Sequence, residues 1–199
     1  ILVDSNGERT MFPDNGANAD LELSDLPDLD GFDGVFVSGY ALLDSRSRDA
    51  VLKMIDKAKI AKLPIFLDPT TTGAMKSVAK EEILKWVALM DGVLLNNEEA
   101  RYLGGSDDIE IAEENLQKLT PLVVIKLGSR GAMAIHNGKF EKVPAVTTNV
   151  VDTTGAGDSF AAGFIPKWLQ SGDLELSLNA GAALAAKCVA TVGARPPLN

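Results

Sequence analysis

The chain has 199 residues, of which 46% are hydrophobic and 24% charged, as is usual for a globular domain with a substantial core. Its formal net charge of −9 argues against a nucleic-acid-binding surface, because no basic cluster offsets it. One cysteine, Cys188, excludes an internal disulfide, and one histidine, His136, nearly excludes sites built from several histidines. No apolar run approaches the ~18 residues of a membrane-spanning helix, so we expect no membrane partner and a cytoplasmic location.

In the N-terminal half, apolar runs at residues 1–3 and 9–12 flank Asn6-Gly7 and predict a β-hairpin. Residues 14–18 predict a loop. Short apolar strands then alternate with stretches of helical spacing. We expect strands at residues 35–37, 65–67 and 93–95, and helices at residues 45–62, which Pro64 ends, and 79–90.

The C-terminal half continues this alternation. We expect helices at residues 98–103 and 109–119, a strand at 123–125, and a hairpin formed by 132–135 and 140–143 across Asn137-Gly138. In the next helix, Phe160, Phe164 and Trp168 share one face. Pro166 falls within that helix, and an interior proline kinks a helix at a cost of about 3 kcal/mol. Asp173 is expected to cap a last, alanine-rich helix that Gly193 ends.

Apolar strands that alternate with helices are typical of a parallel sheet covered on both faces. We find no internal repeat or linker and expect residues 1–199 to form a single domain. Four of the strands run into polar or glycine-bearing segments, which in a parallel sheet lie at one edge, where ligands bind. These segments are Ser38-Gly39, Asp68-Pro69, residues 96–99 and residues 126–128.

Residues 152–160, Asp-Thr-Thr-Gly-Ala-Gly-Asp-Ser-Phe, form the most informative stretch of the chain. Gly155, Ala156 and Gly157 directly precede Asp158, and an apolar helical pattern follows. The N–H groups at a helix N-terminus can hold a phosphate or a transferring phosphoryl group. Asp158 stands where a base could take a proton from a substrate hydroxyl. Composition alone leaves an alternative equally open, in which this is a glycine-rich loop with Asp158 as a helix cap.

The segment from Asp152 to Ile165 resembles the C-terminal signature of the ribokinase/PfkB carbohydrate kinase family, and the resemblance extends along essentially the whole chain. It implies a ribokinase-like three-layer α/β/α fold with a mostly parallel central sheet. Residues 1–18 would be the remnant of a β lid and substrate region, because family members are longer and this chain lacks roughly their N-terminal third. It also implies ATP and Mg²⁺ as cofactors, with Asp158 catalytic and residues 155–157 as an anion hole.

Two strand ends resemble nucleotide-binding motifs of this family. Asn96 and Glu99 occupy its Asn-x-x-Glu positions, which set the Mg²⁺ and phosphates of ATP, the carboxylate often acting through water. In the alternative, Asn96 caps the helix and Glu99 only favours its dipole. Lys126, where the family commonly has Thr, begins a stretch that resembles the nucleotide loop and would hold phosphates. Its other implied binding residues are Gly128, Ser129 and Gly131; a strand-to-hairpin turn is the alternative.

The remaining assignments also come from the resemblance. Val143-Pro144 and the final helix resemble the walls of the adenine pocket, where Asn179 could contact the base in a register that slips by about three residues. Asp152 and Thr154, with the Gly193-Ala194 turn, occupy positions where some members hold K⁺; a loop ordered by side-chain hydrogen bonds is the alternative. Asn18 and Gly39 could border the acceptor pocket.

The resulting hypothesis is an ATP-dependent phosphotransferase that moves the γ-phosphoryl of ATP to a hydroxymethyl group of a sugar or related small molecule. A nucleoside kinase is one alternative. A non-catalytic ATP-binding fragment that lacks the substrate half is the other. An exposed hairpin at residues 1–12 suits strand pairing, so a homodimer is possible.

Overall fold

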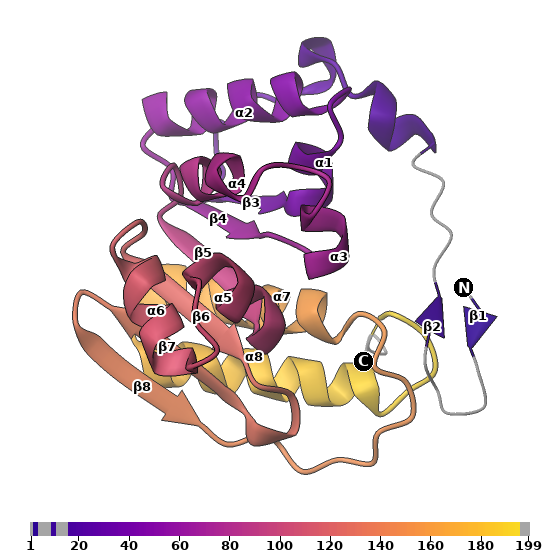
Figure 1. Cartoon of the computed structure of the whole chain (residues 1–199), viewed down its shortest axis with the longest axis vertical. Coiled ribbons are helices and arrows are strands. Elements are labelled where there is room, and N and C mark those ends of the chain that lie inside the picture. The colour runs from indigo at the N-terminus through magenta and orange to yellow at the C-terminus, as the bar shows by residue number, and fades with distance from the viewer. Residues whose placement is uncertain (1, 4–8, 11–15, 196–199) are drawn as a thin grey trace.

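The computed structural model describes residues 2–3, 9–10 and 16–195 (Figure 1). Its strands are β1 (Leu2–Val3), β2 (Arg9–Thr10), β3 (Val35–Ser38), β4 (Ile65–Asp68), β5 (Gly92–Asn96), β6 (Leu122–Lys126), β7 (Ala132–His136) and β8 (Lys139–Val143). Its α-helices are α1 (Gly39–Leu43), α2 (Arg48–Ile60), α3 (Thr72–Met75), α4 (Lys80–Val87), α5 (Asn97–Gly104), α6 (Ile109–Gln117), α7 (Ala156–Ser171) and α8 (Leu174–Val189). Short 3-10 helices are η1 (Gly16–Asp20), η2 (Leu23–Asp25) and η3 (Gly128–Arg130).

The central sheet has six strands in the order β3-β4-β5-β6-β7-β8. Strands β3 to β6 are parallel, whereas β7 and β8 are antiparallel additions at one side. The predicted mostly parallel sheet is therefore confirmed. Because the carboxyl ends of β3 to β6 lie at one edge, the polar segments that follow these strands lie there too.

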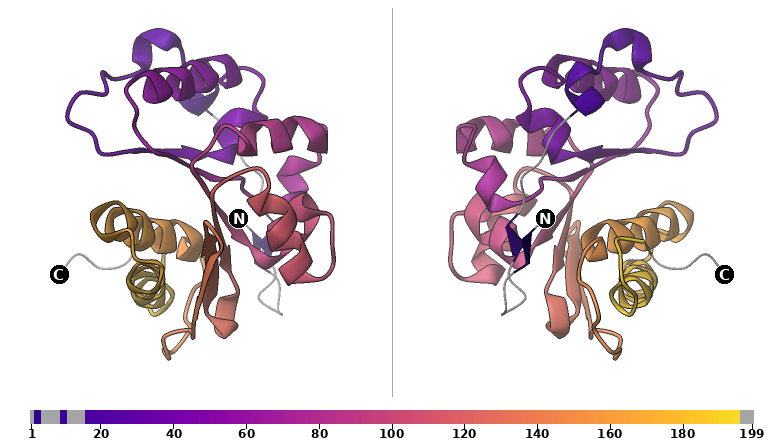
Figure 2. Two further views of the ribbon diagram at one scale, coloured as in Figure 1. Left: turned by 90° about the vertical axis from the view of Figure 1, so that its left-hand side faces the viewer. Right: turned by 90° about the vertical axis from the view of Figure 1, so that its right-hand side faces the viewer.

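Helices cover both faces of this sheet, which gives the expected three layers (Figure 2). On one face, the strands pack against α2, α4, α5 and α6 through buried side chains such as Ile55, Val87 and Leu116. On the other face, α7 and α8 pack on β4 to β8 through Phe160, Phe164 and neighbouring apolar residues. Phe160, Phe164 and Trp168 stack along α7, as their spacing predicted.

Several predicted boundaries differ from the structure for local reasons. The predicted helix at 79–90 ends at Val87, because the N–H groups of Leu89 and Met90 bond three residues back in tightened turns. The last helix ends at Val189, four positions before the predicted Gly193. Residues 16–20 form η1 rather than a loop.

The N-terminal hairpin is confirmed where the structure describes it. β1 and β2 pair antiparallel, with Leu2 opposite Thr10 and Val3 opposite Arg9, in a sheet separate from the central one. The predicted turn at Asn6-Gly7 lies outside the described residues. Among the described residues, no helix is both long and apolar enough to cross a membrane.

Candidate active site

A cavity of about 680 Å³ opens at the carboxyl edge of the parallel strands. Most of the residues that the sequence singled out line it. They are Asn96, Glu99, Lys126, Gly128, Ser129, Gly131, Gly155, Ala156, Gly157 and Asp158. The Asp158 loop thus joins the strand ends at one edge of the sheet.

The loop before α7 depends on Gly155. This residue is the N-cap of α7 and lies in the left-handed region at φ 77°. A Cβ atom at Gly155 would also collide with the carbonyl oxygen of Ala194. Only glycine tolerates both the positive φ and the close approach of Ala194. Glycine at this position therefore allows the sharp turn that presents the start of α7 to the cavity.

Asp158 is exposed and lines the cavity from this first turn. Within the part of the chain that the structure describes, no hydrogen bond or ion pair engages its carboxylate. The alternative role as a helix cap does not apply, because Asp158 lies inside α7 and Gly155 occupies the cap position. Its carboxylate is therefore available to a ligand in the cavity.

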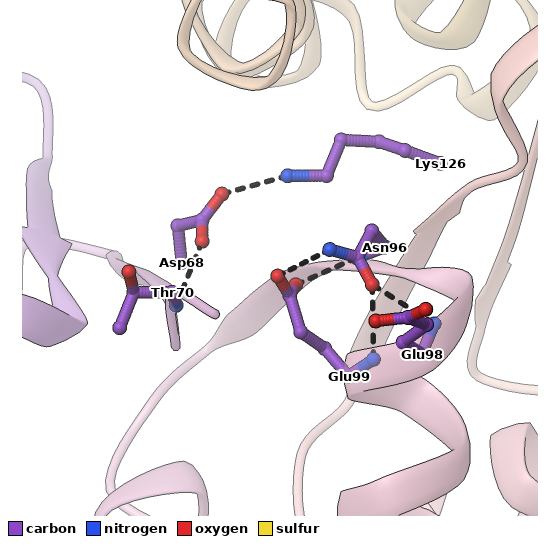
Figure 3. Close-up of polar contacts among 6 residues, drawn as sticks. All are labelled: Asp68, Thr70, Asn96, Glu98, Glu99 and Lys126. Carbon is purple, nitrogen blue, oxygen red and sulfur yellow. Dashed lines mark hydrogen bonds and ion pairs between the residues drawn. The ribbon is translucent and has the colours of Figure 1, made fainter. Parts of the chain in front are cut away.

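Asn96 and Glu99 form a reciprocal capping box at the start of α5 (Figure 3). Asn96 Oδ1 accepts the N–H groups of Glu98 and Glu99, each at 2.9 Å, and Glu99 Oε2 accepts the N–H of Asn96 at 2.7 Å. Asn96 Nδ2 also donates to Glu99 Oε1. The capping alternative is thus correct as geometry. It also explains how the Glu99 side chain is fixed at the cavity.

Burial sets the protonation of Glu99, whose side chain is only 4% exposed. Loss of solvent raises the pKa of this carboxyl to about 7, against the lowering effects of the Asn96 N–H and the Lys126 ammonium. The Asp68 carboxylate adds to the increase. Glu99 therefore exchanges a proton near neutral pH at a position that lines the cavity.

Lys126 makes an ion pair that the sequence did not predict. Its Nζ lies 2.7 Å from Asp68 Oδ2, and both side chains are largely buried (Figure 3). The same ammonium lies 3.4 Å from the place where a Cβ of Gly157 would be. Lys126 thus lies between the end of β4 and the loop before Asp158.

The chain turns from β6 into β7 through η3, and Gly128 and Gly131 both have positive φ there. This matches the alternative of a strand-to-hairpin turn. Gly128, Ser129 and Gly131 nevertheless line the cavity. The turn is therefore placed where a nucleotide could contact its backbone.

The structure corrects the residues assigned to the apolar wall. Asn179 is exposed, and its side-chain amide donates to the carbonyl of Glu175 instead of lining the cavity. The wall of α8 is one turn further on, at Ala182, Ala185, Ala186 and Val189. On the opposite side, the cavity is lined just after the predicted Val143-Pro144, at Ala145, Val146, Thr147, Thr148 and Val150.

Asp152 and Thr154 meet the final turn of the chain but do not line the cavity. Asp152 Oδ1 accepts the N–H of Thr154 at 2.9 Å, and Oδ2 accepts the N–H of Gly193 at 3.1 Å. The predicted association with the Gly193-Ala194 turn is present. It has the form of the alternative, a loop ordered by side-chain hydrogen bonds.

The two residues assigned to the acceptor pocket also lie outside the cavity lining. Asn18 is exposed on η1. Gly39 is buried at the start of α1, and a Cβ there would collide with the backbone of Pro69. Gly39 therefore contributes through close packing. The sequence placed Asp68 at the ligand-binding edge but gave it no role, and it missed Thr70 and Thr71; all three residues line the cavity.

Comparison with known proteins identifies the family to which the chain is similar. The family model described as pfkB family carbohydrate kinase matches residues 1–199. An uncharacterized sugar kinase of Archaeoglobus fulgidus is 31% identical over 206 residues, which cover 100% of this chain and 78% of the relative.

Two solved structures are similar in fold. Fructokinase from Vibrio cholerae O395, with fructose, ADP and calcium bound, has a TM-score of 0.77 at 25% identity and covers 87% of this chain. Adenosine kinase from Sinorhizobium meliloti has a TM-score of 0.84 at 26% identity and covers 90%. The matches span only 60% and 56% of those two proteins. The chain belongs to the pfkB family of carbohydrate kinases.

Proposed function

We propose that the protein transfers the γ-phosphoryl of ATP to a hydroxymethyl group of a sugar or related small molecule. One observation supports this most: the Asp158 carboxylate, which has no partner in the described part of the chain, shares a cavity with the N-terminal turn of α7 and the Lys126 ammonium. Phosphoryl transfer depends mainly on positioning and on stabilisation of charge. A base beside an anion-binding turn meets both needs.

In this proposal Asp158 accepts the proton of the acceptor hydroxyl. The backbone N–H groups of Gly155, Ala156 and Gly157 stabilise the negative charge that develops on the transferring group, for which the N–H of Ala156 gives up its 3.3 Å bond to the carbonyl of Thr153. Lys126 and the turn at Gly128, Ser129 and Gly131 hold the phosphates of ATP. The alanines of α8 and the apolar residues after β8 pack against its base.

The side chains at the cavity could hold Mg²⁺ only if water and phosphate oxygens supplied most of its ligands. Among the described residues, no group of three or more His, Cys, Asp or Glu side chains could hold a metal ion. Mg²⁺ keeps several waters and accepts phosphate oxygens, so Glu99, acting through water, would suffice together with Asn96. When bound, Mg²⁺ would neutralise phosphate charge. A K⁺ site at Asp152 and Thr154 stays a prediction, because both Asp152 oxygens already accept backbone N–H groups.

Two alternatives follow from the comparisons. A nucleoside acceptor is supported by the likeness to adenosine kinase. A non-catalytic ATP-binding fragment is supported by the length, because the match spans 56% to 78% of the relatives and structures compared above.

The test combines binding with a substrate screen. Isothermal titration calorimetry with the ATP analogue adenylyl imidodiphosphate measures nucleotide affinity, and a panel of hexoses, pentoses and nucleosides with ATP measures ADP release. We expect binding and turnover with one acceptor class. Turnover with nucleosides alone would favour the nucleoside kinase, and binding without any turnover would favour the fragment. Absence of nucleotide binding would contradict the proposal.

A further inference from the structure

Asp68 lines the cavity, but the function proposed above gives it no role. It is the last residue of β4, and both oxygens of its carboxylate have partners (Figure 3). Oδ1 accepts the N–H of Thr70 at 3.0 Å, and Oδ2 accepts Lys126 Nζ at 2.7 Å. A carboxylate that is fully engaged in this way does not serve as a base, so its contribution depends on what it holds.

The ion pair joins two strands that are not neighbours. Asp68 ends β4 and Lys126 ends β6, and β5 lies between these strands in the sheet. The two side chains are 17% and 15% exposed. Interactions between charges are stronger where solvent is largely excluded, so this pair fixes the ammonium more firmly than a surface pair would.

The turn that carries Asp68 is itself held in an unusual conformation. Thr70 is buried at 7% exposure and has φ 71°, a region that β-branched residues rarely adopt. The bond from its N–H to Asp68 supports this conformation on one side. On the other side, Pro69 packs so closely on Gly39 that no Cβ fits between them. The end of β4 is therefore fixed independently of Lys126.

The fixed carboxylate holds the ammonium toward the loop. Lys126 Nζ lies 3.4 Å from the position of a Cβ on Gly157, next to the turn that precedes Asp158. A lysine ammonium has three donors, so the bond to Asp68 leaves others for a phosphate. Without Asp68, the flexible lysine stem could place its charge elsewhere in the cavity.

We propose that Asp68 is a positioning residue for phosphoryl transfer, which holds the Lys126 ammonium against the loop before Asp158 and neutralises it until phosphate enters. This inference rests on the proposed function. The Asp68 carboxylate in this role would affect the binding of phosphate and the transition state differently. A carboxylate beside the phosphate site weakens ground-state binding of an anion, while the position it gives Lys126 favours the transition state.

The substitution Asp68→Asn separates these effects. An asparagine oxygen can still accept the N–H of Thr70, so the turn is preserved while the negative charge is lost. We expect adenylyl imidodiphosphate to bind about 3- to 10-fold more tightly, because Lys126 keeps its charge. We expect kcat with the best acceptor to fall about 10-fold, because the ammonium is no longer held in place.

Asp91→Asn is the matched control. Asp91 Oδ2 accepts the N–H of Ile65 at the opposite end of the same strand, and Asp91 does not line the cavity. The control makes the same change of charge near the same strand, and we expect it to alter neither affinity nor kcat. In a Lys126→Met background, Asp68→Asn should leave kcat unchanged, because the group that it positions is gone.

Several outcomes would overturn the inference. Asp68→Asn could weaken binding and turnover equally in both backgrounds, which indicates a structural role for the turn. It could change neither quantity. It could weaken binding only when Mg²⁺ is present, which makes Asp68 a metal ligand. In each case wild-type binding and turnover would still support the proposed function, whereas failure of the wild-type protein to bind the analogue would contradict both.

Discussion

The two sides of the cavity differ in how their polar side chains are held. On the strand-end side, Asp68, Asn96, Glu99 and Lys126 bond to one another or to nearby backbone groups. On the helix side, Asp158 extends from the first turn of α7 without a partner in the described part of the chain. The difference suggests a division of labour, in which the strand ends bind and orient the nucleotide and the helix supplies the reactive group.

The largest effect is expected on the helix side. Asp158→Asn removes the base but keeps the size of the side chain, so kcat should fall by about 100-fold or more. Affinity for adenylyl imidodiphosphate should change little. Steady-state kinetics and calorimetry on the same preparation check this.

Asp173→Asn is the control for Asp158→Asn. Asp173 caps α8 through Oδ1, and asparagine caps equally well. This variant loses the same charge at another helix N-terminus and should retain full activity. Near-normal turnover in Asp158→Asn would show that the helix side of the cavity does not supply the reactive group.

The next largest effect is expected on the strand-end side. Lys126→Met removes a charge-assisted donor and leaves Asp68 near the phosphates, so affinity for the ATP analogue should fall by about 10-fold or more. Calorimetry measures it. Lys142→Met, an exposed lysine of β8, is the control and should bind normally. If Lys126→Met lowered kcat alone and left affinity intact, the strand ends would not be the binding side.

Glu113 is a buried carboxyl outside the cavity, and its Oε1 has no hydrogen-bond partner among the described residues. Burial first, and then Glu110 and Glu114, raise its pKa to about 7 from 4.5. Between these values the folded protein keeps a proton that the unfolded chain releases. The stabilisation is complete below pH 4.5 and is lost as pH rises through 7, by up to about 1.4 kcal/mol per pH unit.

Urea denaturation at several pH values tests this pH dependence of the free energy of unfolding. Glu113→Gln should match the wild type near pH 4.5 and become more stable than the wild type as pH approaches 8, because glutamine has no proton to lose. Turnover should be unaffected. A constant difference at every pH would show that ionisation of Glu113 does not affect the free energy of unfolding.

The smallest effect is expected at the cap of α5. Asn96→Ala removes the acceptor for two backbone N–H groups and should reduce the free energy of unfolding by about 1 kcal/mol. Asn96→Ser keeps a capping oxygen and should recover most of this loss. If alanine and serine were equally destabilising, the role of Asn96 in stability would lie outside the cap.

The sequence correctly placed Asn96 and Lys126 at the cavity, because the carboxyl ends of parallel strands share one edge of the sheet. The sequence wrongly placed Asn179 at the cavity. The alanine-rich α8 has similar small residues at several registers, and its contribution to the cavity lining begins one turn later, at Ala182. Asp68 and Lys126 were each visible as strand ends. Their contact spans 58 positions and a strand between them, which no local pattern reveals.

The prediction of secondary structure was also limited by what a local sequence pattern can reveal. The long amphipathic helices and buried strands were predicted because their periodicity is strong. The one-turn α3, which the Thr71 side chain caps, was missed because four residues carry no period. Gly39 was assigned to the acceptor pocket from the family resemblance, whereas its close contact with Pro69 is set by tertiary packing.

The division of labour is tested most directly by a crystal structure of the protein with ADP, Mg²⁺ and aluminium fluoride, which mimics a phosphoryl group in transfer. We predict that the fluoride lies against the backbone N–H groups of residues 155–158, with Lys126 in contact and the Asp158 carboxylate on the acceptor side. A nucleotide whose phosphates lie away from this turn, or an Asp158 that faces away from them, would contradict it.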